Sequence, residues 1–245
     1  MTTTPVGMRC PECAKQGTKV MRLREMAAVP RVTYTLIAIN VVAFLTEQGQ
    51  FTLFGSTIYG SVIEEGILYR SAIAVNHEYW RLVSAGFLHE NLLHIAFNMY
   101  LLYLLGRMLE PAIGSVRFAA VYFTALLAGS FGALLATGAP SLGASGAVFG
   151  LMGAMVVELR ARRLSVMESG IGGLILINLI LSFSLANISV GAHVGGLIGG
   201  ALAGLALRAA GDRHELLGLL ACFALAATCV AGAIAVAGVS GTGFA

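Results

Sequence analysis

Residues Ser169–Leu207 have the sequence SGIGGLILINLILSFSLANISVGAHVGGLIGGALAGLAL, which contains no Asp, Glu, Lys or Arg. A helix needs about 20 predominantly apolar residues to cross the hydrocarbon core of a bilayer, and this stretch is long enough for two such helices. The polar triplet Asn187-Ile188-Ser189 divides it, so we expect a turn there. The stretch therefore predicts a pair of membrane helices joined by a short connection.

The whole chain has the composition of a membrane protein. Its 245 residues are 58% hydrophobic and only 11% charged, and the mean hydropathy is +0.85. A soluble domain usually has about a quarter charged residues. The net charge of +3 is small and the basic residues form short clusters, so nothing indicates a nucleic-acid partner. We expect the lipid bilayer to be the main surrounding of the chain.

Further apolar segments predict an all-α membrane protein, a polytopic bundle of seven transmembrane helices. Residues 1–31 are a polar, basic leader without an apolar core, so we expect no cleavable signal peptide and an uncleaved first span. The segments expected besides the pair are Val32–Leu45, Leu92–Leu105, Phe118–Thr137, Leu142–Val157 and Leu216–Val239.

The charges of the loops predict the orientation. With seven spans, every Arg-rich or Lys-rich loop falls on one side, and residues 48–91, in which glutamates outnumber arginines, fall on the other. Positively charged loops stay in the cytoplasm. We therefore expect a multi-pass protein of the cell membrane with a cytoplasmic N-terminus and an external C-terminus. We also expect residues 51–90, which mix aromatic and charged side chains, to form an ordered interfacial loop.

Polar side chains occur at a similar depth in the segments that descend from the outer face. These residues are His94 and Asn98 on the second segment, Ser145 on the fourth and His193 on the sixth. Ionisable groups inside a membrane are costly and indicate functional sites. A serine nucleophile needs a base and oxyanion donors within hydrogen-bond reach. The topology predicts that such a set converges near the outer face.

Glycines make close contact between the fourth and sixth segments feasible. Gly146 and Gly150 lie on the fourth, and Gly196, Gly200 and Gly204 repeat every four residues on the sixth. Small residues at this spacing allow two helix backbones to approach closely. We expect this packing to bring Ser145 to His193.

Several motifs resemble those of the rhomboid family of intramembrane serine proteases. The resemblance covers about residues 32–207. The motifs are Gly143-Ala144-Ser145-Gly146, similar to G-x-S-G; His94-Ile95-Ala96-Phe97-Asn98, similar to H-x-x-x-N; Gly191-Ala192-His193-Val194-Gly195-Gly196, similar to A-H-x-x-G; Trp80-Arg81, similar to the W-R of the first loop; and Gly106 with Glu110, similar to G-x-x-x-E.

The resemblance implies a six-helix catalytic core over residues 32–207, followed by a linker and an extra membrane helix in residues 208–245. It implies an intramembrane serine endopeptidase that cleaves transmembrane-anchored proteins, with no cofactor and no metal. The implied site has Ser145 as nucleophile, His193 as base, and His94, Asn98 and the Ser145 amide as the oxyanion hole, with Gly143, Gly146 and Phe149 in support. Phe149 stands where some members have a tyrosine against the catalytic histidine.

The sequence also predicts a dyad without a carboxylate. No Asp or Glu occurs in residues 169–211, around His193. Glu158 and Glu168 belong to the opposite membrane face, and Glu90 lies on the second segment, beside the proposed oxyanion side. We therefore expect packing, for example by Phe149, to orient His193.

Other hydrolase classes fit poorly, while two non-catalytic alternatives stay open. His89 and His94 are five residues apart, so they do not share a helix face as the histidines of H-E-x-x-H do. Asp212 is the only Asp of the chain, which excludes an aspartyl protease. A transporter also places histidines in a helical bundle, although we find no internal repeat. The other alternative is a rhomboid relative that binds transmembrane helices without cutting them.

The cysteines predict no metal site. Cys10-Pro11-Glu12-Cys13 resembles half of a zinc ribbon, but structural zinc needs four ligands and no other Cys or His lies nearby. Cys222 and Cys229 lie too far apart along one helix for a disulfide, so we expect them to pack as apolar side chains.

Overall fold

The computed structural model describes residues 2–4, 7–9, 29–46, 61–136, 139–184 and 189–239. The Cys10-x-x-Cys13 motif and residues 187–188 of the expected turn lie outside these ranges. Strands β1 (Thr2–Thr4) and β2 (Gly7–Arg9) form an antiparallel pair, which the all-α prediction did not include. From residue 29 onward the described elements are helices, as predicted, and the one β-bridge joins two loops.

Seven helices of the described chain coincide with the predicted segments, and three short helices lie between the first two of these. The 3₁₀ turns η1 (Ala85–Phe87) and η2 (Asp212–His214) complete the set. The helices are α3 (Arg31–Thr46), α4 (Ser61–Gly66), α5 (Arg70–Ala74), α6 (Arg81–Ser84), α7 (Leu92–Ile113), α8 (Ser115–Ala136), α9 (Ser145–Ala161), α10 (Ile171–Ser184), α11 (Val190–Ala210) and α12 (Glu215–Val239).

Several predicted boundaries differ from the helix ends, and two of the differences have a clear cause. Helix α7 continues to Ile113 instead of ending at Leu105, because Arg107 and Glu110 end the uncharged run without interrupting the helix. Helix α9 begins at Ser145 instead of Leu142. Gly143 has a φ of 121°, which no residue of a right-handed helix adopts, so the chain turns before the helix starts.

The lengths and apolarity of the helices make this an integral multi-pass membrane protein. Four helical stretches of the described residues are long and apolar enough to cross a membrane: α7, α8, α11, and α12 together with η2. Helices α3 and α10 are apolar but shorter, and α9 has charged residues in its last turns. The count of seven spans therefore stays a prediction.

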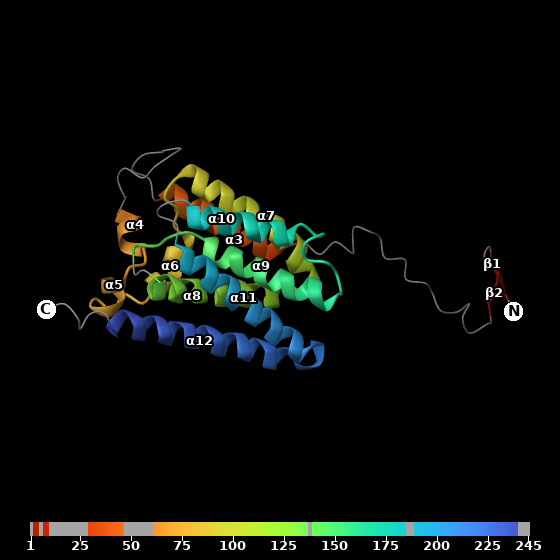
Figure 1. Ribbon diagram of the computed structural model, residues 1–245. Helices are drawn as coiled ribbons and strands as arrows, with labels where there is room; N and C mark the ends of the chain where they lie inside the picture. Colours follow the sequence, from red (N-terminus) through yellow and green to blue (C-terminus); the bar gives the residue numbers. More distant parts are fainter. Residues whose placement is uncertain are drawn as a thin grey trace.

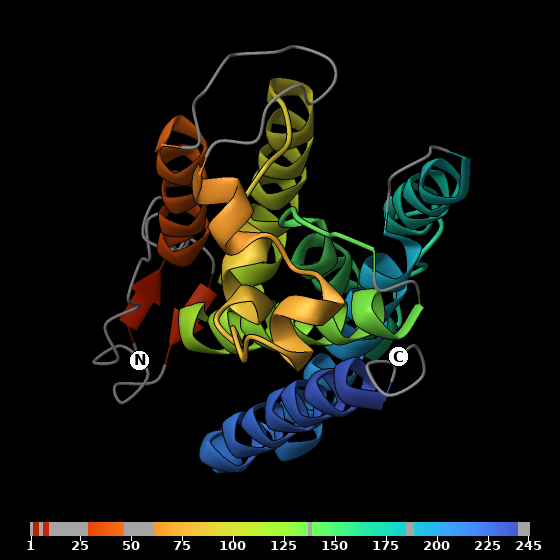
Figure 2. The same ribbon diagram turned by 90° about the vertical axis from the view of Figure 1, so that its left-hand side faces the viewer.

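Helices α8, α9 and α11 form the centre of the bundle, and α11 has one face exposed at Ile198, Leu202 and Leu205. These three helices pack against one another, while α3 packs mainly against α7 and α12 lies outside against α8 and α11 (Figures 1 and 2). Cys222 and Cys229 on α12 are buried free thiols, as their apolar surroundings led us to expect. The arrangement leaves the N-terminal ends of α9 and α11 at the same end of the bundle.

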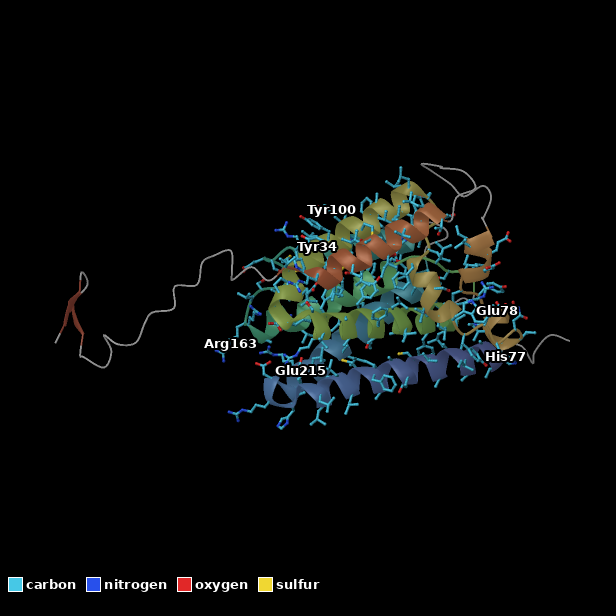
Figure 3. The ribbon with its side chains drawn as sticks, turned by 180° about the vertical axis from the view of Figure 1, so that it is seen from behind. Tyr34, His77, Glu78, Tyr100, Arg163 and Glu215 are labelled. Carbon is cyan, nitrogen blue, oxygen red and sulfur yellow. The ribbon has the colours of Figure 1, made fainter. Side chains whose placement is uncertain are left out.

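Charged side chains gather at the two ends of the bundle. Figure 3 shows His77 and Glu78, from the connection between α3 and α7, at one end, and Arg163 and Glu215 at the other. The basic turn after α9 and the glutamate-containing connection before α7 therefore lie on opposite sides of the apolar helices, as the loop charges predicted.

Candidate active site

The structure brings Ser145 and His193 together at the start of two neighbouring helices. The Oγ atom of Ser145 and Nε2 of His193 are 2.7 Å apart. His193 is buried, with 7% of its surface exposed, and Ser145 is half-buried. A serine hydroxyl at this distance can give its proton to the imidazole, which is the geometry that general-base activation requires.

The turn before α9 determines where Ser145 lies. The positive φ of Gly143 is readily available to glycine, and a methyl group there would lie 2.7 Å from Nε2 of His94. Because α9 starts at Ser145, its first backbone N–H groups have no partners within the helix, and the positive end of the helix dipole points toward the serine. A developing negative charge would be stabilised there.

The connection between α3 and α7 holds this turn in place through its described part, residues 61–90, which contains α4, α5, α6 and η1. Residues 51–60 of the expected ordered loop lie outside the described residues. Backbone hydrogen bonds join Leu68 and Ser141 in both directions, at 3.1 and 2.8 Å, and the Gly143 N–H donates to the Ala85 carbonyl at 2.8 Å. Ser145 is therefore positioned by a separate part of the chain as well as by its own helix.

Arg81, of the Trp80-Arg81 motif, fixes that connection from within. Its side chain is 4% exposed, and Nη1 donates to the carbonyls of Glu64 and Ile67, each at 2.8 Å. Its Nε also pairs with Glu78. A buried arginine with this many acceptors is satisfied, so it joins α4, α6 and the intervening loop into one unit.

Glycines allow α9 and α11 to approach closely enough for the serine and histidine to meet. A methyl group at Gly196 would collide with the carbonyl oxygen of Gly146, and one at Gly200 would collide with that of Gly150. The backbones are in contact at these positions, so any larger residue must push the helices apart. The four-residue glycine spacing on α11 therefore forms the contact surface with α9.

Phe149 lies one turn below Ser145 and covers the imidazole of His193. The two ring centroids are 4.3 Å apart and the ring planes differ by 17°, a stacked arrangement. Phe149 itself is 3% exposed. The ring restricts rotation of the imidazole about its χ2 axis and excludes water from one face.

The sequence analysis missed Ser182, which contacts the other nitrogen of His193. Its Oγ atom lies 2.6 Å from Nδ1 of His193 and 2.6 Å from the carbonyl oxygen of Asn178, one turn earlier on α10. Ser182 is 3% exposed. The sequence did contain a signal for Ser182: it is a polar residue one helical turn after Asn178 in an otherwise apolar segment.

His94 and Asn98 lie on α7, whose start is fixed by a side-chain cap. The Asn91 side chain accepts a hydrogen bond from the His94 N–H at 2.9 Å. The His94 ring lies against Gly143, beside Ser145. The Asn98 amide donates to the His94 carbonyl at 3.0 Å, which uses one of its two hydrogens. The structure thus brings His94 to the serine, and it places Asn98 one turn deeper.

Among the described residues, the groups that bond to the ring of His193 are hydroxyls and not carboxylates. In the part of the chain that the structure describes, the ring nitrogens of His193 bond only to Ser145 and Ser182, and no Asp or Glu forms an ion pair with His193. The group that faces Nδ1 is therefore a neutral hydroxyl.

Three relatives and one domain match identify the family. The Rhomboid domain matches residues 76–210. The chain is 37% identical over 181 residues to Rhomboid protease GluP of Bacillus subtilis (strain 168), which covers 73% of this chain and 35% of that protein. It is 33% identical over 148 residues to RHOMBOID-like protein 6, mitochondrial, of Arabidopsis thaliana (58% and 48% covered).

A third relative carries a different description. Inactive RHOMBOID-like protein 8 of Arabidopsis thaliana is 35% identical over 140 residues, which cover 54% of this chain and 39% of that protein. The chain thus spans between 35% and 48% of the length of these three relatives. The domain match extends over more than half of the chain and includes Ser145 and His193, so this chain belongs to the rhomboid family.

Proposed function

We propose that this protein is an intramembrane serine endopeptidase that cleaves transmembrane-anchored proteins near the outer membrane face. The observation that carries the proposal is the 2.7 Å contact between Ser145 Oγ and His193 Nε2 inside an apolar helical bundle. Membership of the rhomboid family, in which one relative is described as a protease, supports it.

The reaction proceeds in two halves. Ser145 Oγ attacks the scissile carbonyl carbon while Nε2 of His193 takes the hydroxyl proton. The oxyanion accepts hydrogen bonds from the Ser145 N–H and from the side chains of His94 and Asn98. When the C–N bond breaks, the imidazolium gives its proton to the leaving amine. Water, deprotonated by His193, then attacks the acyl-enzyme and releases the new carboxyl group and the free serine.

The position of the site defines the substrate class. Ser145 and His193 lie below the outer end of the bundle, so a substrate must present its backbone at that depth. A peptide bond inside a helix is protected by its own hydrogen bonds, so glycine or proline near the cleavage site favours cutting by weakening the helix.

The same proposal includes the arrangement in the membrane. Six helices, α3 and α7–α11, form the catalytic core, and α12 is an additional span. The N-terminus faces the cytoplasm and the C-terminus the outside, in keeping with the arginine clusters on the side opposite to Ser145. The shorter helices α3 and α10 span where the bilayer is locally thinned.

The test is cleavage and active-site labelling of the full chain in lipid vesicles. The wild type is expected to cut a single-span reporter protein and to react with a fluorophosphonate at one serine. Ser145→Ala and His193→Ala are each expected to abolish cleavage, and the double variant to be no worse, because the pair acts as a unit. Cleavage that survives Ser145→Ala in purified protein would refute the proposal.

A second candidate function is helix binding without cleavage, which the inactive Arabidopsis relative keeps open. It requires that Ser145 does not react. A wild-type chain that binds the single-span reporter, remains folded and takes no label from the fluorophosphonate would favour this function over proteolysis.

A further inference from the structure

We propose that Ser182 of α10 is a positioning residue that holds His193 in the tautomer required of the base. The inference rests on the proposed function and extends it to a third side chain. The assigned chain of hydrogen bonds runs from Ser145 to His193 to Ser182 and ends at the Asn178 carbonyl oxygen.

The direction of each bond follows from the donors available. A carbonyl oxygen can only accept, so the single hydroxyl hydrogen of Ser182 points to Asn178 O, 2.6 Å away. The Ser182 oxygen is then left as an acceptor toward Nδ1 of His193, also 2.6 Å away. Nδ1 must therefore carry the hydrogen of the neutral ring, and Nε2 presents its lone pair to the Ser145 hydroxyl.

This contact also suits the charge that appears during the reaction. When His193 accepts the proton of Ser145, its Nδ1–H becomes a stronger donor, and Ser182 Oγ remains in place to accept it. A hydroxyl that donates to a carbonyl is polarised into a better acceptor. An ionised carboxylate could do the same, but it would be costly to bury at this depth.

The placement of Ser182 is specific within α10. Of the described α10 residues only Ile171 and Ser182 are buried, while the neighbours Leu181 and Phe183 are 42% and 71% exposed. Helix α10 otherwise stands apart from the centre of the bundle (Figure 2). In the second half of α10, the buried residue is therefore Ser182, the one that bonds to His193.

The test compares variants that differ only in the hydroxyl. Ser182→Val and Ser182→Thr have the same shape, and threonine can also donate to the carbonyl one turn earlier. Ser182→Val and Ser182→Ala are expected to lower kcat about tenfold, the rate equivalent of one lost neutral hydrogen bond, with an unchanged KM. Ser182→Thr is expected to restore the rate. Ser184→Ala, at an exposed position on the same helix, is the matched control.

A spectroscopic measurement separates this role from a purely structural one. Nitrogen chemical shifts of isotope-labelled histidine report which ring nitrogen is protonated, and the His193 signal is assigned by its loss in His193→Gln. The Nδ1–H tautomer is expected in the wild type and Ser182→Thr, and a shift toward Nε2–H in Ser182→Val. Equal kcat in the valine and threonine variants, or an unchanged tautomer, would overturn the proposal.

The two proposals fail in different ways. A wild type without cleavage or labelling contradicts the proposed protease, but the tautomer of His193 still tests the contact with Ser182. If the wild type cleaves the reporter and Ser182→Val cleaves it equally fast, only the positioning role of Ser182 is contradicted.

Discussion

At the scale of single residues, the site is a set of neutral groups whose bonds orient one another. Phe149 stacks on His193, Ser182 bonds to Nδ1, and Ser145 bonds to Nε2. Moving neutral polar groups out of water costs less free energy than moving the two charges of an ion pair. The geometry of a base can therefore be fixed without a buried carboxylate.

The oxyanion hole gives the first prediction at this scale. Asn98→Ala and His94→Ala are each expected to lower kcat by about 10²–10³, with a smaller change in KM, because the donors act on a charge that exists only in the transition state. Cleavage of the single-span reporter measures both constants. Since the Asn98 amide also bonds within α7, a thermal unfolding curve of each variant is the control. Full activity in both variants would place the hole elsewhere.

The stacked ring gives the second prediction. Phe149→Tyr keeps an aromatic face on His193 and is expected to retain most activity. Phe149→Leu fills a similar volume without a flat ring, and kcat is expected to fall several-fold because an off-axis imidazole loses its alignment with Ser145. The control is the unfolding temperature, which must be the same in both variants so that a difference in kcat does not come from a difference in stability. A leucine variant as active as the tyrosine variant would show that any apolar side chain suffices.

At the scale of helices, two contacts hold the bundle together, and the first of them also assembles the site. The first is the glycine-mediated approach of α9 and α11, which brings Ser145 to His193. The second lies at the opposite end of the bundle, where the Glu110 carboxylate accepts hydrogen bonds from the N–H groups of Val32 and Thr33, from Thr33 Oγ1 and from Ser115 Oγ. These bonds cap α3 and attach it to α7.

The helix contact gives the third prediction. Gly196→Ala places a methyl group against the Gly146 carbonyl, so α11 must move away from α9 and the 2.7 Å contact of the dyad must lengthen. Cleavage and fluorophosphonate labelling are both expected to fall by at least tenfold, since proximity within hydrogen-bond reach is lost. Gly173→Ala on α10 is the control, because no atom lies within 4 Å of its new methyl group. Equal activity in both variants would contradict this view of the interface.

The cap of α3 gives the fourth prediction. Glu110 is 2% exposed, and Glu110→Ala leaves the N–H groups of buried Thr33 and half-buried Val32 without this acceptor. Breaking buried hydrogen bonds to a charged group is expected to cost about 3–5 kcal/mol, seen as a lower unfolding temperature in detergent. The kcat of the fraction that remains folded is expected to be normal, since Glu110 lies near the end of α7 opposite to the end that carries His94. Glu168→Gln, at an exposed position, is the control.

At the scale of the whole molecule, the bundle has two chemically different ends. The site and the connection held by Arg81 lie at one end, and the arginines that follow α9 and α11 lie at the other. Arg117 on α8 pairs there with Asp212 and Glu215, which ties the start of α12 to the rest of the molecule. The bundle therefore has Ser145 and His193 near one of its two ends and the arginines at the other.

The topology gives the fifth prediction. Reporter domains fused after Gly211 and after Ala245 are expected to report opposite sides of the membrane, cytoplasmic and external, because α12 crosses between them. Protease protection of the reporter in sealed vesicles measures the side. Cleavage of a substrate is the control for folding of each fusion. Reporters on the same side would remove α12 as a span.

The sequence by itself determined where the membrane helices lie and which residue types are available for chemistry. Hydropathy is a property of each residue in turn, so an uncharged run such as Ser169–Leu207 predicts helices before any packing is known. The costly polar residues Ser145 and His193 were visible for the same reason, because the segments around them are almost entirely apolar, and His94 was visible as an ionisable residue near the start of an apolar segment. The four-residue glycine spacing also indicated which helices meet.

Only the tertiary structure decided how those residues face one another. Whether Ser182 reaches His193 depends on the rotation and tilt of α10 against α11, which a pattern along one helix does not determine. The same holds for the Asn98 amide, which bonds within its own helix, and for the start of α9, which depends on the backbone of Gly143 and its contact with Ala85. Periodicity fixes which face of a helix is apolar, whereas packing at close range fixes which atoms touch.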